Sequence, residues 1–252
     1  MSAPLDDRGL LLGDGLFETL LARGGELVLW DEHLARLTAG CAVLGLPAPD
    51  PAEARRLCED AAAGLARAAV RLTLTAGSGG RGLDRPPAPA PRLFAAASPA
   101  ARPQGPVRLV TVSVRRNEGS PVSRLKTLSY LDNVLARREA GAAEALMLNG
   151  RGEIACAAAA NLFWIVGGRL ETPALACGVL DGIVRGQVLA AAQALGVQTA
   201  QARAPREALD RAEGMFLTNS LIGVRRVDLL DGREVPDHPL IAALAGAISW
   251  SW

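Results

Sequence analysis

Short runs of apolar and polar residues recur along the chain, and their spacing predicts both strands and helices. Residues 70–75 alternate apolar and polar side chains, as a half-buried strand does. Residues 31–44 carry apolar side chains at helical spacing, with Asp31 as the predicted N-cap. Further strands are predicted at residues 16–22, 26–29, 93–97, 107–114, 144–148, 153–155, 162–166 and 214–218. Further helices are predicted at residues 51–67, 131–142 and 239–248, and one begins near residue 182.

Segments rich in glycine and proline divide this pattern. Residues 77–91 are expected to form a loop, and residues 98–106 are the best candidate for a linker. We therefore predict a small N-terminal α/β domain over residues 1–98, a linker over 99–106 and a larger domain over 107–252. The fold class is α/β or α+β with two lobes, and a cleft between lobes is the default ligand site.

Composition and charge narrow the function. The 252 residues carry 27 basic and 26 acidic side chains, so no basic excess indicates nucleic acid or a membrane surface as a partner. The four cysteines are widely spaced, which predicts reduced thiols and neither a disulfide framework nor a metal site. The first residues lack a signal-peptide pattern and no apolar run could span a bilayer, so a cytoplasmic location is expected.

Lysine is nearly absent from the chain. Lys126 is the only one, and the other 26 basic residues are arginine. A lysine amine can lose its proton, attack an aldehyde and form a Schiff base, whereas guanidinium stays protonated. For surface charge alone the two residues are roughly interchangeable. A nucleophilic role and an ordinary surface lysine therefore both stay open for Lys126 on composition alone.

The sequence around Lys126 resembles a known motif. Residues 126–130 (Lys-Thr-Leu-Ser-Tyr) are similar to the cofactor-lysine segment of the class IV, or fold type IV, pyridoxal-phosphate enzymes. These include branched-chain and D-amino-acid aminotransferases and aminodeoxychorismate lyase. Other segments resemble family motifs in the family's order, and together they cover nearly the whole chain: residues 13–19, 32–37, 161–163, 172–173, 180–185 and 216–220. The resemblance implies a barrel-like sheet with helices in the larger domain, and a homodimer.

The resemblance also implies pyridoxal 5'-phosphate as cofactor, with Lys126 as its Schiff-base partner and acid/base. Backbone amides of Ile183 and Val184, at a predicted helix start, and the hydroxyl of Ser220 would hold the phosphate, and free N–H groups there suit an anion.

Two further side chains are assigned to the cofactor by the same resemblance. Arg36 would add a charged fork to the phosphate. A solvated helix face, or a local contact with His33, is the alternative for Arg36. Tyr130, the only tyrosine, would lie near the cofactor's phenolic oxygen, and the alternative is a tyrosine of the core or an interface.

Cys156 is a departure from the family pattern. The family usually places a glutamate five residues before the asparagine that matches Asn161, where it pairs with the protonated ring nitrogen. Counting back reaches Cys156, and Glu153 would point to the other face of a strand. A thiol is a weak donor and acceptor, so the ring would be a weaker electron sink. Elimination tolerates this better than transamination does.

Within the family, the Lys126 segment looks most like that of aminodeoxychorismate lyase. That enzyme releases pyruvate from 4-amino-4-deoxychorismate and leaves para-aminobenzoate for folate synthesis. The substrate has two carboxylates, and Arg81 and Arg115 (or its neighbour Arg116) are candidates to bind them, with ordinary surface charge as the alternative.

Two other functions stay open. One is a class IV aminotransferase acting on D-amino or branched-chain acids. The other is a catalytically impaired homologue, because Cys156 replaces the usual glutamate. A hydrolase is disfavoured, since His33 and His238 are the only histidines and neither accompanies a nucleophile motif.

Overall fold

The computed structural model describes residues 4–102 and 104–248. Contacts divide the chain into two compact units. The first comprises Met1–Ala101 and Leu125–Tyr130, and the second comprises Arg102–Arg124 and Leu131–Trp252. The chain first passes from the first unit to the second between Ala101 and Arg102, within the residues predicted as the linker. Residues 125–130, which the sequence placed in the second domain, instead belong to the first unit.

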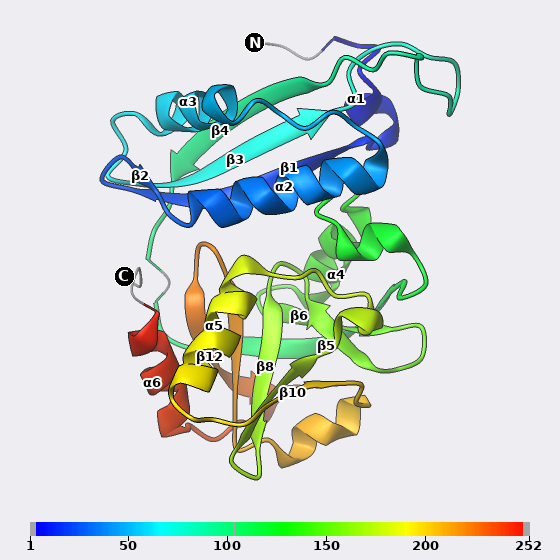
Figure 1. The fold of residues 1–252 in the computed structure, drawn as a ribbon. Helices are drawn as coiled ribbons and strands as arrows, with labels where there is room; N and C mark the ends of the chain where they lie inside the picture. The colour runs from blue at the N-terminus through cyan, green and yellow to red at the C-terminus, as the bar shows by residue number, and fades with distance from the viewer. Residues whose placement is uncertain (1–3, 103, 249–252) are drawn as a thin grey trace. The chain divides into compact units, whose positions relative to one another are not determined.

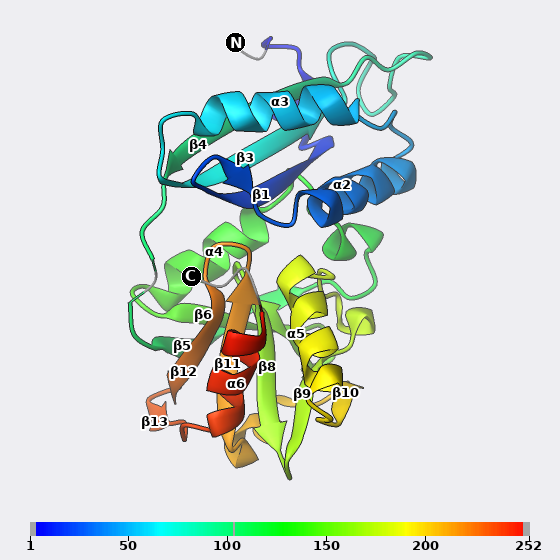
Figure 2. The same cartoon turned by 60° about the vertical axis from the view of Figure 1, so that its left-hand side comes forward.

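The first unit is an antiparallel sheet covered by two helices. Its strands, in the order β2-β1-β3-β4, are β1 (Gly15–Arg23), β2 (Glu26–Leu27), β3 (Arg67–Thr75) and β4 (Arg92–Pro99). Helices α2 (Trp30–Leu44) and α3 (Pro51–Ala62) cover one face of the sheet, as Figures 1 and 2 show, and a short α1 (Arg8–Leu12) precedes β1. Leu20, Leu37 and Leu72 lie in the core between sheet and helices because alternate strand residues point toward the helices.

Two predicted helix ends in this unit were wrong. Helix α2 begins at Trp30 after Leu29, whose φ is 54°, so Asp31 lies in the first turn and is not the N-cap. In the first turn its negative charge still interacts favourably with the helix dipole. Helix α3 ends at Ala62 and not near residue 67, and the chain turns at Gly64 (φ 77°) before entering β3. Gly64, just past the last helical residue, is a stop signal that the prediction did not use.

The second unit is a curled mixed sheet. Its strand order is β10-β9-β8-β11-β12-β5-β6-β7, and β13 pairs with β12. The strands are β5 (Val107–Arg116), β6 (Glu144–Asn149), β7 (Ile154–Ala157), β8 (Asn161–Val166), β9 (Arg169–Pro173), β10 (Thr199–Ala202), β11 (Gly214–Asn219), β12 (Gly223–Leu230) and β13 (Arg233–Glu234). The sequence did not predict β9, β10, β12 or β13.

Three α-helices pack on this sheet. Helix α4 (Leu131–Ala140) lies against β5 and β6, whereas α5 (Ile183–Ala194) and α6 (Pro239–Ala247) lie side by side over β11 and its neighbours (Figure 2). Among the described residues of this unit, short 3-10 turns also lie at Pro121–Arg124, Leu175–Cys177 and Arg206–Arg211.

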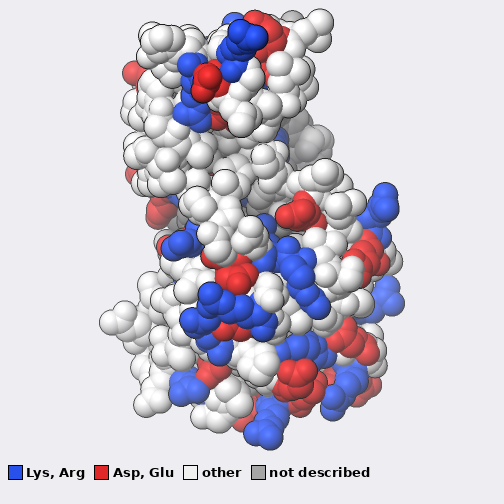
Figure 3. All heavy atoms as spheres, turned by 90° about the vertical axis from the view of Figure 1, so that its right-hand side faces the viewer, with Lys and Arg blue, Asp and Glu red and all other residues white. Residues whose placement is uncertain are grey.

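Surface charge is mixed in sign. On the face in Figure 3, basic and acidic side chains intermingle, with no large area of one sign. Among the described residues, no helix has the length and apolar character needed to cross a membrane.

Candidate active site

The segment that carries Lys126 runs beside the start of β1. The N–H of Phe17 donates to the carbonyl oxygen of Lys126 at 2.8 Å, and the N–H of Leu128 donates to that of Gly15 at 3.0 Å. A Cβ on Gly15 would lie 2.3 Å from the carbonyl oxygen of Leu74 and 2.8 Å from Leu128 Cδ1. A side chain at Gly15 would therefore clash with the backbone of β3 and with Leu128, so glycine lets both lie this close to β1.

Two aromatic rings face the Lys126 amine. Its Nζ lies 4.3 Å from the ring centroid of Phe17 and 5.4 Å from that of Tyr130. The two rings meet edge to face, with centroids 5.1 Å apart. This contact orients the amine and shields it partly from water, while the aromatic faces still tolerate its positive charge.

Glu18 is a buried carboxylate on β1 that holds two residues of α2. His33 Nδ1 lies 2.8 Å from Glu18 Oε2. Arg36 donates to both carboxylate oxygens, at 2.9 Å from Nε and 2.6 Å from Nη2. Burial raises the pKa of Glu18, but Arg36 and His33 outweigh burial and lower it to about 2. Glu18 is therefore ionised at neutral pH and fixes the guanidinium of Arg36.

Lys126 is partly buried, and burial lowers the pKa of its amine from 10.5 to about 8. The cations Arg36 and Arg71 lower that pKa further, and Glu18 opposes them. A substantial share of the amine is therefore neutral near pH 8, and only the neutral amine is nucleophilic.

Arg71 was not identified from the sequence. Its guanidinium carbon lies 3.7 Å from the ring centroid of Phe17, and among the described residues it forms no ion pair. Arg71 lies on β3, two residues before Thr73, which pairs with Phe17 of β1. An exposed arginine without a carboxylate partner, beside a nucleophilic amine, can bind an anionic substrate group.

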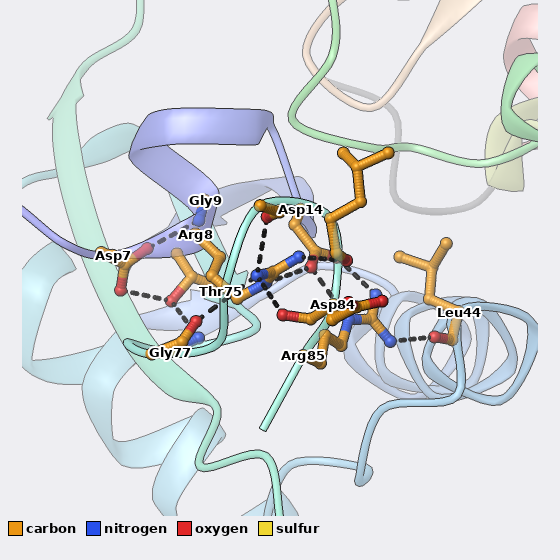
Figure 4. Close-up of polar contacts among 12 residues, drawn as sticks. Asp7, Arg8, Gly9, Asp14, Leu44, Thr75, Gly77, Asp84 and Arg85 are labelled. Carbon is orange, nitrogen blue, oxygen red and sulfur yellow. Dashed lines mark hydrogen bonds and ion pairs between the residues drawn. The ribbon is translucent and has the colours of Figure 1, made fainter. Parts of the chain in front are cut away.

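The loop that carries Arg81 is fixed to the rest of the first unit. Arg8 donates to Asp14 Oδ2 at 3.0 Å and to the carbonyl oxygen of Asp84 at 2.9 Å, and Arg85 also donates to Asp14 (Figure 4). Arg81 itself is exposed on this loop. Its predicted role in binding the substrate stays a prediction.

In the second unit, the start of α5 offers an anion site. Gly182 is its N-cap and provides no side-chain cap, so the N–H groups of Ile183 and Val184 are not claimed by a capping side chain. A Cβ on Gly182 would lie 1.9 Å from Asn161 Oδ1. Thr218 pairs with Asn161 across β8 and β11, and its buried hydroxyl has no partner among the described residues. These donors fit a phosphate.

Ser220 follows β11 in a tight turn. Asn219 holds this turn, since its Oδ1 accepts from the N–H groups of Leu221 and Ile222, each at 2.9 Å, and its Nδ2 donates to the carbonyl oxygen of Ala159. Ser220 is thereby presented at the same end of β11 as Thr218.

Cys156 lies on β7 in an apolar cluster that includes Val112 and Met147. Burial raises the pKa of its thiol, so the side chain is a neutral thiol. Glu153 is engaged elsewhere, because Asn149 donates to it at 2.7 Å and Arg203 at 2.8 Å. Its carboxylate is held by these partners and does not replace the missing glutamate.

The family model for class IV amino-transferases matches residues 15–230 of the chain. The chain belongs to the class IV aminotransferase family. The predicted recognition and the type IV fold are therefore confirmed, and so is the prediction of an enzyme from the lyase or aminotransferase group.

Three proteins similar to this chain illustrate the range of its relatives. A putative branched-chain-amino-acid aminotransferase of Methanocaldococcus jannaschii is 32% identical over 241 residues, which cover 91% of this chain and 83% of that protein. The solved structure of 4-amino-4-deoxychorismate lyase from Pseudomonas aeruginosa is 35% identical, with a TM-score of 0.89 over 98% of this chain and 94% of that one. A hypothetical aminotransferase from Mycobacterium tuberculosis, solved with PLP bound, is 27% identical, with a TM-score of 0.86 over 99% and 92%.

The structure brings together some of the residues predicted for this class IV enzyme. Lys126, Tyr130 and Arg36 lie in one cluster of the first unit, together with Glu18, which the sequence did not single out. Ile183, Val184, Ser220 and Cys156 all belong to the second unit. Arg115 is exposed, and its Nη1 donates to the carbonyl oxygen of Val112 on its own strand at 3.1 Å. The functional role of each of these residues stays a prediction.

Proposed function

We propose that the chain is a pyridoxal-phosphate-dependent lyase that converts 4-amino-4-deoxychorismate to para-aminobenzoate and pyruvate, a step of folate synthesis. The observation that carries the proposal is the Lys126 amine, whose pKa is lowered to about 8 beside two aromatic rings and the unpaired cation Arg71. Similarity to the lyase from Pseudomonas aeruginosa and the thiol of Cys156 favour elimination over transamination.

The proposed cofactor ligands follow the family resemblance. Lys126 would bind the aldehyde carbon of pyridoxal phosphate, and Arg36, Ile183, Val184 and Ser220 would hold its phosphate. The unpartnered hydroxyl of Thr218 near the start of α5 supports a phosphate there. When bound, the cofactor supplies a carbonyl that condenses with amines and a ring that withdraws electrons from the carbon next to the amine.

Lys126 has two proposed tasks in turnover. Its neutral amine takes the proton from the amine-bearing carbon of the substrate, and the resulting ammonium returns a proton, directly or through a water, to the departing enolpyruvyl oxygen. Arg71 and Arg81 are candidates for the substrate carboxylates. Aromatisation of the product ring drives the reaction forward, so a weak electron sink suffices.

Borohydride trapping tests the role of Lys126. Reduction with pyridoxal phosphate is expected to attach the cofactor to wild type on the only lysine of the chain, and mass spectrometry locates it. Lys126→Ala should show no attachment and should lose lyase turnover by roughly 10⁴-fold or more. An equal extent of attachment in wild type and variant would contradict the assignment.

Substrate assays separate the lyase from its main alternative, a class IV aminotransferase, which the similarity to the Methanocaldococcus jannaschii protein favours. A lyase releases pyruvate from aminodeoxychorismate. An aminotransferase converts the bound cofactor to its amine form with D-alanine or a branched-chain amino acid. A protein that binds the cofactor and does neither would be an impaired homologue.

We further infer a homodimer, as the family resemblance implies. Helix α4 leaves Leu131 67% exposed and Val134 58% exposed, which is compatible with an apolar contact. Light scattering at several protein concentrations tests this, and a monomer throughout would exclude it.

A further inference from the structure

Arg116, at the end of β5, is a buried arginine whose charge is not neutralised. Its side chain donates to the carbonyl oxygen of Gly178 at 3.2 Å, to Asn133 Oδ1 at 3.1 Å and to the carbonyl oxygen of Ser123. All three acceptors are neutral, and no carboxylate of the described residues pairs with Arg116. Buried charges are normally paired, so this arrangement needs an explanation.

Arg116 and Cys156 lie on the same face of the sheet. β5, β6 and β7 are adjacent, with Arg116 paired to Asn149 and Cys156 paired to Met147. Asn149 and Met147 are two residues apart on β6 and therefore point to the same side. A second link runs through Asn133 of α4, which accepts from Arg116 and donates to the carbonyl oxygen of Ala158 at 2.7 Å, two residues beyond Cys156.

The charge of Arg116 reaches Cys156. Burial raises the pKa of the thiol, and Arg116 acts in the opposite direction. The position where the family usually has a carboxylate is thus occupied by a neutral thiol within the field of a buried cation. A glutamate there would neutralise Arg116 and could also accept a hydrogen bond from a protonated ring nitrogen. The thiol does neither.

We propose that Arg116, left without a carboxylate by Cys156, holds the ring nitrogen of the cofactor in its unprotonated state and so sets the reaction type. A nearby cation disfavours the protonation of a pyridine, because both carry positive charge. An unprotonated ring withdraws electrons weakly, which suits elimination more than transamination. This inference rests on the proposed function, since it takes pyridoxal phosphate as the cofactor with its nitrogen on the Cys156 side.

The test measures the protonation state of the cofactor's ring nitrogen. Holoenzyme is prepared with pyridoxal phosphate carrying nitrogen-15 in the ring, and the chemical shift of that nitrogen is followed against pH without substrate. Wild type should show the unprotonated shift at neutral pH. Cys156→Glu should show the protonated shift, and its isosteric control Cys156→Gln should stay unprotonated.

Removing the cation should act in the same direction as adding the carboxylate. In Arg116→Met the nitrogen should titrate at a pH higher by about one unit or more, equivalent to about tenfold easier protonation. Arg108→Met, an exposed arginine on the same strand, is the matched control and should leave the titration unchanged. If Arg116→Met does not fold, the pair Cys156→Glu and Cys156→Gln still decides the question.

The outcomes separate this inference from the proposed function. A protonated nitrogen in wild type at neutral pH would overturn the inference, whatever the lyase assay shows. An unprotonated nitrogen in a protein that fails to cleave aminodeoxychorismate would support the inference and refute the proposed function. Absence of bound cofactor would refute both.

Discussion

Each unit of the molecule holds an arginine or lysine, partly buried in the first unit and buried in the second, at a position predicted to lie near the cofactor, and the surroundings of that charge differ between the units. In the first unit, the carboxylate of Glu18 holds Arg36 and moderates the environment of Lys126. In the second, Arg116 contacts only neutral acceptors, and a thiol stands where a carboxylate is usual. A carboxylate thus holds the arginine of the first unit, whereas the arginine of the second unit has neutral partners among the described residues.

Removing the carboxylate from the first unit should have the largest effect. The pKa of Glu18 is lowered from 4.5 to about 2, which corresponds to about 3 kcal/mol of stabilisation. Because the folded-state pKa is depressed, this stabilisation is present above pH 4.5 and is lost as the pH falls toward 2. Glu18→Gln should therefore lower the free energy of unfolding at neutral pH by roughly 3 kcal/mol, measured by chemical denaturation.

The matched control for this variant is Glu59→Gln. Glu59 pairs with Arg55 at 2.8 Å on the exposed face of α3, where ion pairs contribute about 0.5 kcal/mol or less. Equal losses of unfolding free energy in the two variants would show that the buried carboxylate stabilises the fold no more than an exposed one.

Removing a cation from the first unit should have an intermediate effect, on Lys126. The neutral fraction of its amine should rise with pH around a midpoint near 8. Arg71→Met removes a cation that lowers this pKa, so the midpoint should move upward, by up to about one pH unit. The rate of labelling by an amine-specific reagent against pH measures the midpoint in the cofactor-free protein, and mass spectrometry separates Lys126 from the N-terminus.

Arg23→Met, at the far end of β1 from Phe17, is the control and should not move that midpoint. A downward shift in Arg71→Met would mean that Arg71 does not act on Lys126 through its charge.

The smallest effect is expected from substituting Glu153, the carboxylate nearest to Cys156 along the chain. Its partners Asn149 and Arg203 hold it at the edge of the sheet, so Glu153→Gln should cost about 1 kcal/mol or less of stability. It should also leave the nitrogen-15 shift of the bound cofactor unchanged. A changed shift would assign to Glu153 the role that we give to Arg116 and Cys156.

The elements with clear periodicity could be predicted from the sequence. β3 and α2 were predicted because their apolar residues follow one period and one face of each is buried. β1 is buried on both faces, and it was predicted from the turn residues that follow it, Arg23, Gly24 and Gly25. β12 was not, since its Arg225, Arg226 and Asp228 interrupt the apolar pattern. β10 was not, because alanine, threonine and glutamine give a short strand little apolar character.

The candidate site was predictable only in part. The unusual lysine and the spacing from Cys156 to Asn161 are properties of the sequence and could be interpreted directly. Glu18 and Arg71 lie more than 50 residues from Lys126 in the chain, and only the pairing of β1 with β3 and with the Lys126 segment brings them near it. Sequence reasoning about neighbours along the chain could not find them.

The position of residues 125–130 in the chain affects how the first unit folds during translation. The first unit needs this segment beside β1, yet it is synthesised only after 23 residues of the second unit, Arg102–Arg124, have already been added. A nascent chain that ends near residue 101 therefore lacks the peptide that pairs with Gly15 and Phe17, and that edge of the sheet stays open. Folding of the first unit is thus completed only after part of the second unit has been synthesised, by the segment that carries Lys126.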